Sequence, residues 1–77
     1  MKNKREELVN EKKEREGELK ILQQKIEYNI KLTLETYGEG AERDAQLAYL
    51  NKHNLNMIKE IGVELAEINK QLLKLDN

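Results

Sequence analysis

The stretch YGEGA (residues 37–41) decides the fold, because it places two glycines within three residues near the middle of a chain of 77. Each glycine costs a helix interior about 1 kcal/mol relative to alanine, so the pair favours a break. Gly38 can adopt the left-handed conformation that ends a helix, and Gly40 can precede a new one. One continuous, kinked helix is the alternative. We therefore predict two helices joined by a Gly-Glu-Gly turn at residues 38–40.

The composition is that of long helices. The chain contains no proline, tryptophan, phenylalanine or cysteine, and 38% of its residues are charged, which is typical of solvated helices and coiled coils. The first helix is predicted over about residues 3–37, beginning at a capping-box pair, Asn3 and Glu6, and the second over about residues 41–75. Because a short turn makes such helices antiparallel neighbours, the predicted fold is all-α, with one helical-hairpin domain over residues 1–77.

Apolar residues recur at steps of three and four along both predicted helices, as in amphipathic helices. In the second helix the stripe begins at Leu47, and from Asn51 onward the steps alternate strictly, as in the heptad seam of a coiled coil. The stripe of the first helix is expected to pack against Leu47 and the alanines near the turn. Its members are Leu19, Leu22, Ile26, Ile30, Leu34 and Tyr37.

The most apolar part of the second helix lies opposite the most polar part of the first. Residues 61–75 would face residues 1–18, in which NEKKEREGE (residues 10–18) holds no large apolar side chain. Burying one Leu or Ile contributes about 1.5–3 kcal/mol, so a wet stripe would be costly. We therefore expect copies to form a homo-oligomeric four-helix bundle, with a homodimer favoured and residues 1–18 peripheral or frayed. The predicted interface between copies comprises Ile58, Ile61, Leu65, Ile68, Leu72 and Leu75.

Polar residues interrupt the seam in NKHNLN (residues 51–56). A polar residue at a seam position fixes the register and the oligomeric state at some cost in stability. We predict that Asn51, Asn54 and His53 form such a polar register layer, which Asn29 can join from the first helix. A binding site for a polar ligand or for a partner's loop is the alternative.

The charge balance of the chain and the motifs that it lacks count against several classes of function. The chain has 14 basic and 15 acidic residues and no one-signed segment, so neither nucleic acid nor an anionic membrane is attracted at long range. It has no membrane-spanning apolar run and no signal-peptide core, which predicts a cytoplasmic protein. No nucleophile–base pair, phosphate loop or metal-ligand set occurs, so neither a cofactor nor enzymatic activity is expected.

These patterns predict a small, non-enzymatic accessory protein. It would be a protein–protein interaction module, acting as an adaptor, inhibitor or assembly factor, that self-associates through its C-terminal helix and binds another protein. The alternative is a nucleic-acid-binding helical dimer that acts as a regulator. The acidic pI of about 5.9 and the lack of a basic face count against that alternative.

Overall fold

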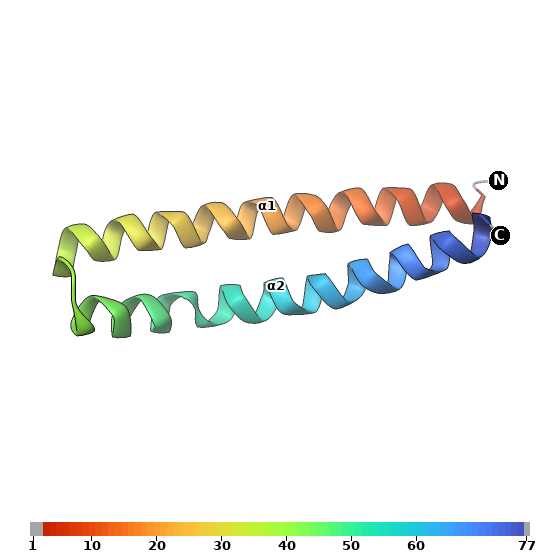
Figure 1. Ribbon diagram of the computed structural model, residues 1–77. Coiled ribbons are helices and arrows are strands. Elements are labelled where there is room, and N and C mark those ends of the chain that lie inside the picture. Colours follow the sequence, from red (N-terminus) through yellow and green to blue (C-terminus); the bar gives the residue numbers. More distant parts are fainter. Residues whose placement is uncertain (1–2, 77) are drawn as a thin grey trace.

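The computed structural model describes residues 3–76. Two helices, α1 (Lys4–Tyr37) and α2 (Ala41–Asp76), run side by side in opposite directions, so that the start of α1 and the end of α2 lie together and the turn lies at the other end (Figure 1). The molecule is a rod of 54 × 17 × 15 Å. The predicted all-α fold of two helices packed on each other is confirmed.

Local signals define both ends of α1. The backbone of Asn3 is extended, and its side-chain oxygen accepts a hydrogen bond of 2.7 Å from the backbone N–H of Glu6, which satisfies one of the free donors at the helix start. At the other end Gly38 has a φ of 71°, and its N–H donates to the carbonyl of Leu34 at 2.9 Å. Of residues 1–18, which we expected to be peripheral or frayed, residues 4–18 form the first turns of α1, and residues 1–2 lie outside the described part of the chain.

The turn passes directly into α2. Gly40 has a φ of 136°, a backbone conformation that glycine adopts without steric cost. Its carbonyl accepts a hydrogen bond of 3.1 Å from the backbone N–H of Asp44. The acidic residues Glu42 and Asp44 lie in the first turn of α2, where the helix dipole favours negative charge.

One face of each helix is covered by the other helix, and we call the line of residues along these faces the seam. The positions of the seam alternate between steps of four and three, which is the heptad spacing of coiled coils. In α1 they are Leu8, Lys12, Arg15, Leu19, Leu22, Ile26, Asn29 and Thr33, all buried or half-buried. In α2 they are Leu47, Asn51, Asn54, Ile58, Ile61, Leu65, Ile68 and Leu72, also buried or half-buried.

Two polar contacts show how the helices align. In mid-rod the side-chain amide of Asn29 is hydrogen-bonded to Asn51 at 2.8 Å. At the open end Arg5 forms an ion pair with Asp76. The two helices are therefore paired along their whole length.

Candidate functional site

The stripe predicted to join two copies is largely covered within the single chain. Ile61 and Ile68 are only 2% and 6% exposed, and Leu8 of α1 is buried in the same half of the seam. The other predicted interface residues are less covered: Ile58, Leu65 and Leu72 are half-buried, and Leu75 is 48% exposed. The expectation that residues 1–18 leave this stripe wet is therefore wrong for Ile61 and Ile68, which are buried, whereas Leu75 at the end of the stripe is exposed.

The α2 stripe is covered by α1 side chains that we expected to be solvated because they are charged. Lys12 and Arg15 occupy the seam positions between Leu8 and Leu19, and both are half-buried. The aliphatic stems of Lys and Arg can shield apolar surface while their charged ends reach water. The signal was present in the sequence, since steps of four and three connect Leu8 to Leu19 through positions 12 and 15.

The charged end of Arg15 is held by two carboxylates. Its guanidinium pairs with Glu18 at 2.8 Å and, across the seam, with Glu64 at 2.5 Å. Glu18 and then Glu64 raise the pKa of Arg15 above its ordinary value. The side chains of Arg15 and Glu64 are 32% and 49% exposed, so solvent screens the pair and its contribution to stability is small.

The stripe predicted for α1 coincides with the seam over only part of its length. Leu22 is buried, and three other predicted members are half-buried: Leu19, Ile26 and, in α2, Leu47. The remaining three are exposed by about two fifths: Ile30 (38%), Leu34 (43%) and Tyr37 (41%). Successive steps of four rotate a stripe around a helix of about 3.6 residues per turn, so this stripe leaves the seam after Ile26.

The seam of α1 continues instead into a buried polar layer. The amide nitrogen of Asn29 donates to Oδ1 of Asn51 at 2.8 Å, and that of Asn54 donates to the same oxygen at 3.4 Å. Asn51 and Asn54 are 5% and 9% exposed, respectively. His53 is exposed and lies outside this layer, because two residues turn a helix by about 200°. Three asparagines therefore join the helices in the middle of the rod.

A shallow hollow lies beside the polar layer. A binding site for a polar ligand in this region was the alternative prediction from the sequence. The hollow is lined by Ile21, Gln24, Lys25, Tyr28, Asn29 and Asn54. The amide nitrogens of Asn29 and Asn54 already donate to Asn51. The bond between Asn29 and Asn51 pairs the two helices, as polar seam residues do in coiled coils, and each of the two donating amide groups keeps a second N–H.

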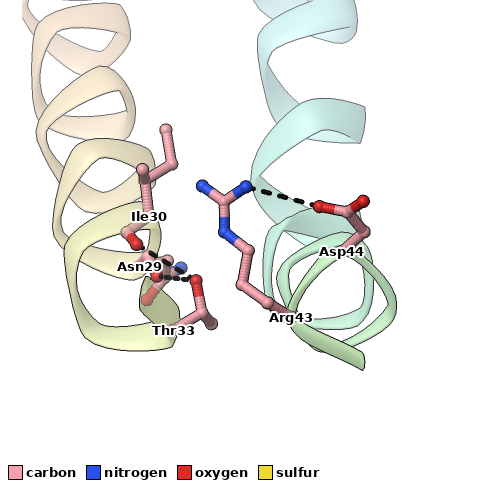
Figure 2. Close-up of polar contacts among 5 residues, drawn as sticks. All are labelled: Asn29, Ile30, Thr33, Arg43 and Asp44. Carbon is pink, nitrogen blue, oxygen red and sulfur yellow. Dashed lines mark hydrogen bonds and ion pairs between the residues drawn. The ribbon is translucent and has the colours of Figure 1, made fainter. Parts of the chain in front are cut away.

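Polar side chains also fill the seam between this layer and the turn (Figure 2). Thr33 is 1% exposed, and its hydroxyl donates to the carbonyls of Asn29 and Ile30 in its own helix, at 2.8 and 3.1 Å. Arg43 extends from α2 into the space between the helices and reaches Asp44 at 3.3 Å. Its Nε atom is buried and has no hydrogen-bond partner within residues 3–76. Little apolar packing therefore supports the turn end of the seam.

Exposed apolar residues lie beside this polar part of the seam. In each helix, three exposed apolar residues come one position after a seam residue, or after a position that would continue the spacing of the seam toward the turn. In two antiparallel helices, the positions that directly follow seam residues lie on the same side of the pair. The apolar residues concerned are Ile30, Leu34 and Tyr37 in α1 and Ala41, Ala45 and Ala48 in α2, all exposed. We call these six residues the turn-side apolar face. It was missed because three of its members were assigned to the interior of the hairpin.

The fold and this face define the class of protein: a two-helix hairpin with a heptad-spaced seam and an exposed apolar face near its turn. Comparison with protein-family models, with curated proteins and with solved structures finds no match to the chain. Within residues 3–76, neither helix has a stretch long and apolar enough to cross a membrane. In the same residues, the acidic side chains and His53 form no group of three that could hold a metal ion.

Proposed function

We propose that this chain is a non-enzymatic protein–protein interaction module that works as a self-associating helical hairpin. The observation that carries the proposal is the distribution of its large apolar side chains. Within the described chain twelve of them are exposed, whereas four are buried: Leu8, Leu22, Ile61 and Ile68. Apolar surface left exposed and contiguous on a small protein marks a site of association.

The surface available for self-association differs from the one predicted from the sequence, because part of the predicted surface is buried within the hairpin. Ile61 and Ile68 are packed against α1, so copies could meet through them only if the hairpin opened. The exposed residues near the turn need no such opening. In this proposal self-association presents the helices of two or more hairpins to another protein, for which the assembly serves as an adaptor, inhibitor or assembly factor.

Sedimentation equilibrium over a wide range of chain concentrations tests the proposal. We expect the weight-average mass to exceed that of one chain and to rise with concentration toward a defined oligomer. A mass of one chain at every concentration would contradict self-association.

A binding titration distinguishes this proposal from the alternative that the chain is a nucleic-acid-binding regulator. Fluorescence anisotropy with duplex DNA and with RNA at low salt should show no binding, because the chain is nearly neutral overall. Binding that weakens steeply as salt is added would favour the regulator instead.

A further inference from the structure

We infer that the hairpin is a conformational device with two parts: residues 30–50, around the turn, open and close as one unit while the rest of the two helices stays paired. We call residues 30–50 the turn segment. Three features of the segment point to this opening. Few of its residues are covered, its side chains make no polar contact across the seam, and the charge of Arg43 is partly buried between the helices.

Few residues of the turn segment are covered by the opposite helix. Thr33 is buried, Arg43 and Leu47 are half-buried, and the other residues of the segment are exposed. Of the three covered residues only Leu47 is apolar. Outside the segment the hairpin buries four large apolar residues, namely Leu8, Leu22, Ile61 and Ile68. Parts of a protein with few buried apolar contacts are the ones that open locally at low free energy.

Inside the turn segment, residues 30–50, no side-chain hydrogen bond or ion pair crosses from one helix to the other. The hydroxyl of Thr33 donates to carbonyls of its own helix, and Arg43 pairs with its neighbour Asp44. The nearest side-chain bond across the seam joins Asn29 to Asn51 at 2.8 Å, and both residues lie just outside the segment. This bond therefore marks the border at which opening stops.

The turn segment also holds a charge that is poorly compensated while the segment is closed. Arg43 extends between the helices (Figure 2), and its Nε atom is buried without a hydrogen-bond partner in residues 3–76. Its contact with Asp44 measures 3.3 Å, and the side chain of Asp44 is 69% exposed. Removing a guanidinium from water without full pairing costs free energy. Because opening relieves that cost, Arg43 favours the open state.

Opening has to unwind the ends of both helices. The turn between Tyr37 and Ala41 consists of residues 38–40 alone, which is too short to let two intact helices swing apart while their other parts stay paired. Gly38 and Gly40 also regain more backbone freedom on opening than other residues would. Unwinding exposes backbone amides to water, so hydrogen exchange reports it. A partner with different affinities for the open and closed segment would shift this equilibrium.

Native-state hydrogen exchange of the full chain, followed by NMR at one low chain concentration, tests the opening. The amides to compare are those of residues 30–38 and 44–50 in the segment with those of residues 15–26 and 58–68 outside it. We expect similar protection factors throughout the segment, about tenfold or more below those outside it. Protection equal to that outside the segment, or protection that falls gradually toward the turn as in simple fraying, would overturn the inference.

A mild variant outside the segment tests whether the two parts open separately. Ile61→Val should speed the exchange of residues 58–68 about fivefold, and it is conservative enough to leave the hairpin folded. The protection of the turn segment should not change, because residue 61 stays covered when only the segment is open. An equal loss of protection in both parts would show that the hairpin opens as a single unit, contrary to the inference.

A matched pair of variants inside the segment tests the role of Arg43. Arg43→Leu should slow the exchange of the turn segment by about tenfold, as expected when a buried polar group without a partner is removed. Lys31→Leu also replaces a cation of the segment with leucine, but at an exposed position, so it should change the exchange by no more than about twofold. Unchanged or faster exchange in Arg43→Leu, or equal slowing in Lys31→Leu, would contradict this role.

Discussion

The terminal half and the turn half of the hairpin differ in what their seam buries. In the terminal half, or at its border with mid-rod, the buried residues are apolar: Leu8, Leu22, Ile61 and Ile68. In the turn half the buried seam residues are polar: Thr33, Asn51 and Asn54. Large apolar residues are exposed in both halves, among them Val63 and Leu73 in the terminal half and Ile30, Leu34, Tyr37 and Leu50 in the turn half.

This contrast separates two physical roles. Apolar burial contributes free energy roughly in proportion to the area removed from water and is not directional, so the terminal half supplies most of the stability of the hairpin. Hydrogen bonds between buried amides are directional and are lost if one helix slides. The turn half therefore holds the hydrogen bonds that resist sliding of one helix past the other, while Ile30, Leu34 and Tyr37 of that half remain exposed.

The largest effect is expected in the terminal half. Ile61→Ala should lower the free energy of unfolding by about 2–5 kcal/mol, because it removes a fully covered side chain and leaves a cavity. Thermal unfolding followed by circular dichroism at one fixed chain concentration measures the change. Val63→Ala is the control, since Val63 is 67% exposed, and it should change stability by about 0.5 kcal/mol or less. Equal losses for both variants would mean that α1 does not cover Ile61.

A smaller effect is expected at the polar layer of the turn half. Asn51→Ala removes the acceptor used by Asn29 and Asn54, and the stranded amides should cost about 1–3 kcal/mol. Replacing Asn29, Asn51 and Asn54 together with Leu should restore the melting temperature or raise it, because no unpaired amide of the layer remains. The loss of directional bonding should then broaden the distribution of registers and oligomeric states. A triple variant less stable than Asn51→Ala would argue against this role.

The smallest effect is expected at the ion pair that crosses the seam. Arg15→Met keeps an aliphatic stem over the seam but removes the pairs with Glu18 and Glu64, so the loss of stability should be the smallest of the three, because solvent screens these pairs. Because the pKa of Arg15 is raised, its charge persists below the ordinary arginine value and is lost only as pH rises through the raised one. The wild-type advantage should fade as salt is added. A loss that salt leaves unchanged would assign the effect to packing.

The sequence predicted the architecture well where short-range signals were sufficient. Asn3 with Glu6 predicted the start of α1, and the two glycines predicted the turn, because capping and positive φ depend on a few neighbouring residues. The seam of α2 was also readable, since its steps of three and four are regular. Asn29 was correctly expected to join Asn51.

The sequence misled where the two helices had to be considered together. Ile30 and Leu34 are as apolar as Leu22, and no local signal in the sequence indicates that the seam passes through Asn29 and Thr33 instead. Lys12 and Arg15 have the composition of a solvated face, yet they cover the α2 stripe. Hydropathy alone therefore predicted that Ile61 and Ile68 would need a partner to cover them, although α1 buries both, and it placed Ile30 and Leu34, which are exposed, in the interior.

By itself, the sequence determined two helices, their ends and the turn between them, because these depend on backbone conformation and hydrogen bonds within a few residues. Only the tertiary structure decided which flank of α1 faces α2, and with it which apolar residues are covered and which remain exposed. A helix presents side chains all around its axis, and the rotation at which two helices meet minimises the free energy of the whole seam. A few polar contacts, such as that between Asn29 and Asn51, can therefore turn several leucines and isoleucines outward.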